Sequence, residues 1–196
     1  MINMANITDW AFDVMQAGKG ACRLRDIGIG RLFEVGGVEF IKCDEQGNTV
    51  PAIAKNVWKK SIFSRRSNDF RESEILADLK DNFLPIIINQ AGIEGVTECV
   101  THLKSLDGLN QYGDIRSLVS IPDLEFYREY AEIIEPYRVD KWWWLANPWS
   151  IKPHYDPYYV CLVAPSGSVD DGDYDCSSGV RPRLNFLSSI FVAPID

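Results

Sequence analysis

The sequence has few of the residues and motifs on which enzyme chemistry usually depends. It contains two histidines, His102 and His154, and neither lies in a hydrolase or metal-binding pattern. The chain also has no Gly-x-Ser-x-Gly elbow, His-Glu-x-x-His helix, phosphate-binding loop or complete Gly-x-Gly-x-x-Gly turn. We therefore expect a non-enzyme with no catalytic residue, no bound metal and no cofactor.

Paired cysteines are missing as well. The five cysteines, at positions 22, 43, 99, 161 and 176, are odd in number and show no Cys-x-x-Cys spacing. This argues against a full disulfide framework and against a zinc knuckle, and it favours free thiols in a reducing compartment. A pairing of Cys161 with Cys176 across a hairpin is the alternative, although buried apolar cysteines are commoner than redox pairs.

Long apolar runs and an excess of positive charge are also absent. No stretch approaches the ~18 apolar residues of a membrane helix, and residues 1–8 lack the basic start and apolar run of a signal peptide. The formal net charge of −8 disfavours non-specific attraction to nucleic acid or anionic lipid. We expect synthesis in the cytoplasm, no nucleic-acid partner and no membrane insertion.

The sequence does contain enough apolar patterning for one domain. Its 196 residues suit a single core, and the aromatic content of 12% is more than such a core requires. Short strand-like segments predominate, at residues 31–35, 38–43, 49–57, 86–88, 97–103, 142–145, 158–163 and 180–186.

Two main helices are predicted among these strands. Residues 75–84 carry apolar side chains at helical spacing along one face, and Pro85 is expected to end that helix. Residues 120–123 have the form of a capping box, from which a second helix is expected to continue to Pro136. The mixture predicts the α+β class.

The N-terminal segment is expected to form an arm. Thr8 is suited to cap a short helix over residues 9–17, followed by Gly18 as a stop signal. We expect this arm to span residues 1–29 and the main domain to span residues 30–196.

Three consecutive tryptophans occupy positions 142–144. In a strand, Trp142 and Trp144 point to one face and Trp143 to the other. One set can therefore fill the core, while the other covers a sheet or stacks on a sugar or peptide.

The segment from 147 to 179 is rich in Trp, Tyr, Asp, Ser and Gly, a composition typical of adaptable binding surfaces. Long polar hairpin loops are the other interpretation. Carboxylates alternate over residues 170–175, but the Gly and Glu positions of a calcium loop are missing, so no metal is expected. The candidate ligand-binding residues are Trp149, His154, Tyr155, Asp156, Tyr158, Asp171, Asp173, Tyr174 and Asp175.

Two separated blocks resemble a known family. The first block covers residues 68–84, from Asn68 through Ser73, Ile75 and Leu79 to Phe83. The second joins Trp143-Trp144-Leu145 to Val180-Arg181-Pro182 and Leu184, with residues 119–125 fitting the segment between the blocks. Departures from the usual pattern occur at Leu76, Lys80, Ala146 and Asn147.

The family that these blocks resemble is a largely uncharacterised one of Firmicutes and their phages. Its plan is similar to C-type-lectin-like domains and to the formylglycine-generating-enzyme fold. The resemblance covers residues 32–191 and implies a C-type-lectin-like mixed or antiparallel sheet with two main helices and long loops. It also implies adjacent terminal strands and a ligand-binding loop face at 147–178. Neither the calcium motifs of lectins nor the paired active-site cysteines of the enzyme are matched.

The resemblance implies a phage virion surface protein that is either receptor-binding or capsid-decorating. Such a protein would display its lectin-like loop face to a host-surface glycan or protein, contact other virion proteins through the N-terminal arm and form a homo-oligomer. The alternatives are a host-encoded glycan- or peptide-binding module and an oxidase related to the formylglycine-generating enzymes.

Overall fold

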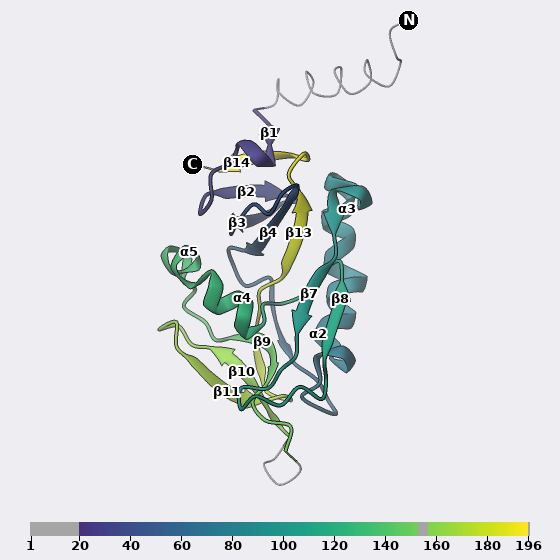
Figure 1. Ribbon diagram of the computed structural model, residues 1–196, viewed down its shortest axis with the longest axis vertical. Helices are drawn as coiled ribbons and strands as arrows, with labels where there is room; N and C mark the ends of the chain where they lie inside the picture. Colours follow the sequence, from purple (N-terminus) through teal and green to yellow (C-terminus); the bar gives the residue numbers. More distant parts are fainter. Residues whose placement is uncertain (1–19, 153–156, 196) are drawn as a thin grey trace, which may run out of the picture.

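The described part of the protein contains fourteen short strands in three sheets, joined by short helices and loops. The computed structural model describes residues 20–152 and 157–195 (Figure 1). The largest sheet has the order β1 (Cys22–Arg23), β14 (Phe191–Ile195), β2 (Leu32–Val35), β3 (Val38–Lys42), β4 (Thr49–Ala54), β13 (Arg183–Leu187) and β6 (Val96–Thr97). The second has the order β11 (Val169–Asp173), β10 (Tyr159–Val163), β9 (Trp143–Pro148), β12 (Ser177–Val180) and β5 (Lys59–Ile62).

A separate ribbon pairs β7 (Cys99–His102) with β8 (Asp114–Ser117). Every strand pairing is antiparallel except that of β12 with β9. The expected α+β class, with mostly antiparallel sheets and few helices, is therefore confirmed.

The two ends of the described chain lie in the same sheet. β14 pairs with both β1 and β2, so the terminal strands are neighbours, as the resemblance implied. Leu24, in the short 3-10 helix η1 (Leu24–Asp26), is fully buried in the core. The described part of the expected 1–29 arm is therefore packed on the domain expected at 30–196. The helix expected at 9–17 lies outside the described residues.

The β2–β3 hairpin follows the sequence pattern closely. Gly36 and Gly37 both have positive φ, 63° and 74°, as a two-residue type I′ turn requires. Glycine reaches these angles without a steric penalty, which explains why the pair lies between two apolar runs.

The first long helix extends further than its sequence indicates. It comprises α2 (Glu74–Asp78), the π-helical turn η3 (Leu79–Phe83) and α3 (Leu84–Ala91) in succession. The expectation that Pro85 ends the helix is wrong, because Pro85 lies in the first turn of α3, where a missing N–H is tolerated. The wider turn η3 precedes it, so the strand expected at 86–88 is also wrong and these residues are helical.

The second helical segment is split. α4 (Leu124–Glu129) and α5 (Ala131–Ile134) are separated by Tyr130, whose φ of −107° and ψ of 15° are not helical. Asp123, not Ser120, caps α4 by accepting the Phe126 N–H at 2.8 Å, so the expected capping box is wrong. The Ser120 hydroxyl lies 2.7 Å from that of Thr101 instead. The remaining 3-10 turns are η2 (Phe70–Glu72), η4 (Ile93–Gly95) and η5 (Glu135–Tyr137).

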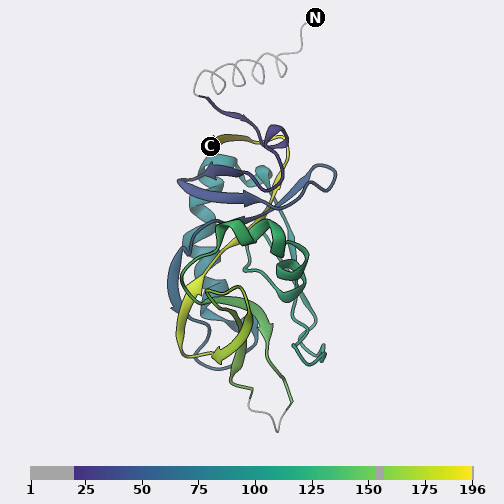
Figure 2. The same ribbon diagram turned by 90° about the vertical axis from the view of Figure 1, so that its left-hand side faces the viewer.

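The tryptophan strand β9 separates two apolar clusters. Trp144 packs in the cluster that contains the α2–α3 helix, whereas Trp143 packs with α4 and α5. Figure 1 shows these helical segments on opposite sides of the molecule, and Figure 2 shows the same arrangement from the side. Core packing is therefore confirmed for two of the three indoles, while Trp142 stays 42% exposed.

Candidate functional site

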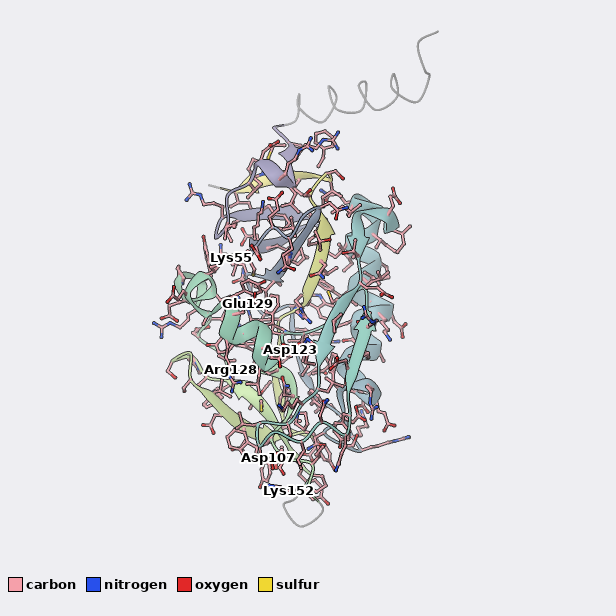
Figure 3. All side chains as sticks on the ribbon, viewed as in Figure 1. Lys55, Asp107, Asp123, Arg128, Glu129 and Lys152 are labelled. Carbon is pink, nitrogen blue, oxygen red and sulfur yellow. The ribbon has the colours of Figure 1, made fainter. Side chains whose placement is uncertain are left out.

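A cavity of about 640 Å³ opens at the end of the molecule remote from β1 and β14. It is formed by the segment after β9, the start of β10, the loop between β7 and β8, and β11. Its lining residues are Leu106, Asp107, Trp149, Ser150, Lys152, Tyr159 and Asp171. Figure 3 shows Asp107 and Lys152 close together at this end.

Buried hydrogen bonds hold the wall of the cavity in place. The Trp149 N–H donates to the Tyr159 carbonyl at 3.0 Å. The buried amide of Asn68 donates to the carbonyls of Ser150 and Tyr159, at 2.9 and 3.2 Å, and accepts from the Tyr112 hydroxyl at 2.9 Å. Asn68 begins the first block of the family resemblance, and here it fixes the backbone behind the two aromatic lining residues.

Asp107 is held in its ionised form. The Ser105 hydroxyl donates to one carboxylate oxygen at 2.5 Å, and the Ser150 hydroxyl donates to the other at 2.9 Å. The Lys152 ammonium lies 3.0 Å from the second oxygen. The hydrogen bond from Ser105, followed by those from Lys152 and Ser150, lowers the pKa of Asp107 against the smaller opposing effect of desolvation.

Asp171 has the opposite environment. It lies on β11 opposite Cys161 of β10 and is partly buried. Burial raises the pKa of its carboxyl group, and the neighbouring carboxylates of Asp170 and Asp173 raise it further. Within residues 20–152 and 157–195, no lysine, arginine or histidine forms a salt bridge with Asp171.

The aromatic part of the lining comes from Trp149 and Tyr159. Trp149 is partly buried against the cluster of Trp143, and Tyr159 is 37% exposed. Both residues line the cavity together with Asp107 and Lys152. The cavity thus combines flat apolar surfaces with fixed hydrogen-bonding groups, a combination suited to binding a small polar ligand.

The structure brings only some of the sequence candidates to this cavity. Trp149 and Asp171 line it. Four other candidates are described in the structure but lie outside the lining: Tyr158, Asp173, Tyr174 and Asp175. The remaining candidates, His154, Tyr155 and Asp156, lie outside the described residues.

Tyr158 and Tyr174 form a separate aromatic pair, with ring centroids 5.4 Å apart and planes 29° apart. The Tyr174 carbonyl also accepts the Phe63 N–H at 2.8 Å. Tyr174 is also partly buried against the cluster of Trp144, so it supports the fold between β11 and β12.

Five lining residues were not among the sequence candidates: Leu106, Asp107, Ser150, Lys152 and Tyr159. Tyr159 is the first residue of β10 and directly follows the candidate Tyr158, so strand alternation, which places adjacent side chains on opposite faces, could have indicated it. Asp107 offered no signal, since its loop meets the β9 end only through tertiary contacts such as the 3.1 Å bond from Leu106 N–H to the Pro148 carbonyl.

A smaller cavity of about 260 Å³ lies between α4 and β13. Asp123 and Arg183 line it, and both are buried. Asp123 caps α4 and accepts the His102 N–H at 2.9 Å, while Arg183 donates to the carbonyls of Ile121 and Val100. The hydrogen bonds of Asp123 and Arg183 therefore stabilise the fold.

The cysteines give no sign of a redox pair. All five are free, with Cys161 buried and Cys176 exposed. Burial raises the pKa of Cys161 to about 12, so its thiol is protonated near neutral pH. Cys176 has ligand atoms of Asp173 and Asp175 within 4.8 Å, but all three side chains are exposed and nothing else described there indicates an ion.

None of the helices described in the structure has both the length and the apolar character needed to cross a bilayer. Comparison with protein-family models, curated proteins and solved structures finds no match to this chain.

Proposed function

We propose that this protein is a non-enzymatic recognition domain whose cavity at the ends of β9 and β10 binds a carbohydrate. The observation that carries the proposal is the lining itself. Two aromatic side chains, Trp149 and Tyr159, share one cavity of about 640 Å³ with the ion pair of Asp107 and Lys152. A cavity of this size accommodates a small ligand of a few rings.

Carbohydrate suits this lining better than a purely apolar ligand. A pyranose ring has C–H faces that pack on aromatic rings and hydroxyl groups that donate and accept hydrogen bonds. Asp107 accepts hydrogen bonds and Lys152 donates them, and both are already held by neighbouring groups. Because less side-chain entropy is lost on binding, such prearranged groups favour affinity.

We further propose the C-type-lectin-like arrangement and the setting that the sequence resemblance implies. The domain would act on a phage virion surface, as a receptor-binding or capsid-decorating protein with a host-surface glycan as its ligand. Residues near the N-terminus would contact other virion proteins, and the domain would form a homo-oligomer. The neighbouring terminal strands β1 and β14 support this, because they lie at the end opposite the cavity.

The oxidase alternative finds less support. A pair of catalytic cysteines requires a reactive thiolate, and the buried Cys161 is protonated near neutral pH. A host-encoded binding module would use the same cavity, so the setting needs its own test. Electron microscopy and host adsorption should change in particles that lack the gene product if the virion setting is right; unchanged particles and adsorption would exclude it.

Binding itself is tested on a glycan array with the full chain and two matched variants. Tyr159→Ala removes a lining ring and should abolish or strongly weaken the carbohydrate signal. Tyr158→Ala removes the adjacent ring, which is 47% exposed but lies outside the cavity, and should leave the signal unchanged. Equal signals from both variants, or no glycan bound by the unaltered chain, would contradict the proposal.

A further inference from the structure

We propose that the cavity selects an amino sugar whose amine is free and protonated, in preference to the same sugar in its N-acetylated form. This inference rests on the proposed carbohydrate function and adds the chemical class of the ligand. The inference depends on which charged side chains of the lining form an ion pair and which one does not.

The charges of Asp107 and Lys152 compensate each other. Their carboxylate and ammonium groups lie 3.0 Å apart, and two serine hydroxyls complete the carboxylate's hydrogen bonds. Asp171 is the third charged residue of the lining, and no cation among the described residues pairs with it. Among the described lining residues, Asp171 is therefore the one negative charge without a cationic partner.

The surroundings of Asp171 make an interaction with a cation more favourable. Partial burial disfavours the ionised form of Asp171, and the carboxylates of Asp170 and Asp173 on the same strand add to this effect. Arg128 of α4 acts on the thiol of Cys161, but it neither lines the cavity nor is among the groups that shift Asp171. A ligand ammonium group would supply the missing positive charge.

The strand register gives this ammonium a defined place. Tyr159 pairs with Asp173 and Cys161 pairs with Asp171, so Tyr159 and Asp171 project from the same face of the sheet as diagonal neighbours. Such neighbours are separated by roughly 7–8 Å. A sugar ring stacked on Tyr159 can therefore direct one substituent toward the Asp171 carboxylate.

Acidic sugars are disfavoured by the same lining. A carboxylate or phosphate on the ligand would meet Asp171 unpaired, and it would have to compete with Asp107 for Lys152. An N-acetyl group would place a neutral amide where the cavity presents its unpaired charge, and it would leave that charge uncompensated.

The test is calorimetric titration of the full chain with two β-1,4-linked glucosamine oligomers of equal length, one fully deacetylated and one fully N-acetylated. The titrations are made at about pH 6, below the pKa of roughly 7.7 of an α-amino group, so that most amines of the oligomer are protonated. Salt near 0.15 M suppresses long-range attraction to the acidic protein. The deacetylated oligomer should bind at least about tenfold more tightly, a difference of about 1.4 kcal/mol.

Two variants of identical net charge separate the site from general electrostatic attraction. Asp171→Asn should reduce the preference to less than about threefold. Asp170→Asn removes the same charge on the opposite face of β11 and should keep the preference. Both should stay folded, since each removes one of several neighbouring carboxylates.

The possible outcomes distinguish the two proposals. Equal or tighter binding of the acetylated oligomer would overturn the amino-sugar inference and leave carbohydrate binding intact. Equal loss in both variants would show general attraction and would overturn the inference in the same way. Binding of neither oligomer would also overturn it, and the glycan array would then decide whether the cavity binds another sugar.

Discussion

Arg181 joins the two larger sheets through a buried charge. Its guanidinium donates to the carbonyls of Ala54 and Lys55, at 3.1 and 3.0 Å, and lies 4.9 Å from the ring centre of Trp143. Burial lowers its pKa to about 10, and the group still carries its proton near neutral pH. The planar fork of arginine can donate to both carbonyls while it stacks on an indole, which the single ammonium group of lysine cannot do.

The reactivity of each cysteine thiol should decrease as its burial increases. Iodoacetamide should modify exposed Cys176 first in the folded protein and partly exposed Cys22 more slowly. Cys43, Cys99 and Cys161 should resist, because burial raises the pKa of each and blocks access. Peptide mapping by mass spectrometry reads out each site, and guanidinium-unfolded protein, in which all five should react, is the control. Rapid modification of Cys161 in the folded state would contradict this expectation.

Asp107 should contribute stability that depends on pH. Its pKa is lowered in the folded state, so the ionised form stabilises the fold above the unfolded value of about 4, and this stabilisation is lost as the pH falls through the folded pKa. Since the side chain is 29% exposed, Asp107→Asn should cost less than about 1 kcal/mol at pH 7.

Urea unfolding of both proteins at several pH values measures the effect of Asp107→Asn. The difference in unfolding free energy should shrink below about pH 4 as the native carboxylate takes up its proton. A difference that stays constant down to acid pH would show that the hydrogen-bond geometry, and not the charge, is responsible.

At the residue scale, the sequence predicted which residue types line the cavity better than it predicted which individual residues do. It indicated Trp149 and Asp171 because aromatic and acidic residues gather near β9 to β11. It did not indicate Asp107, which reaches the cavity only because its loop bonds to the end of β9. Such contacts join segments more than 40 residues apart, and no local pattern encodes them.

Whole elements were predictable where one physical signal dominated. The β2–β3 hairpin followed from a glycine pair between alternating apolar residues, and the apolar face of α2 from its helical spacing. β11 was missed because the acidic run 169–173 has low strand propensity and pairs only along its full register with β10. The segment 180–186 was read as one strand, but Pro182 divides it between two sheets.

Leu79 offers a direct test of the long helix. It lies in η3 and is fully buried in the cluster that contains Trp144. Leu79→Ala should therefore cost about 2–5 kcal/mol of unfolding free energy, through lost burial and the remaining cavity. Chemical denaturation measures this cost.

The neighbouring Lys80→Ala is the matched control for the helix. Lys80 is exposed in the same turn, so its replacement should change stability by less than about 0.5 kcal/mol. Similar effects of the two substitutions would mean that η3 does not face the core as described.

At the scale of the molecule, neither large sheet has a core of its own. The cluster around Trp144 includes Phe33 and Phe40 of the seven-stranded sheet together with Val160 of the five-stranded sheet. The cluster around Trp143 likewise joins Ile41 of the first sheet to residues of the second. The chain also passes directly from β12 in one sheet to β13 in the other. Separating the sheets would expose both clusters at once.

The described domain should therefore unfold in a single cooperative step. Far-ultraviolet circular dichroism reports the sheets, and tryptophan fluorescence reports mainly the region around β9, since four of the six tryptophans lie at 142–149. The two thermal transitions should coincide, with equal calorimetric and van't Hoff enthalpies. Leu79→Ala should lower the midpoint temperatures of both transitions together. Leu79 lies in η3 and Trp144 in β9, but the two side chains belong to one apolar cluster. If fluorescence changed at a distinctly lower temperature than circular dichroism, the cavity end would be a separate folding unit. The wall of the cavity, on which the proposed ligand selection depends, would then be lost before the rest of the domain unfolds.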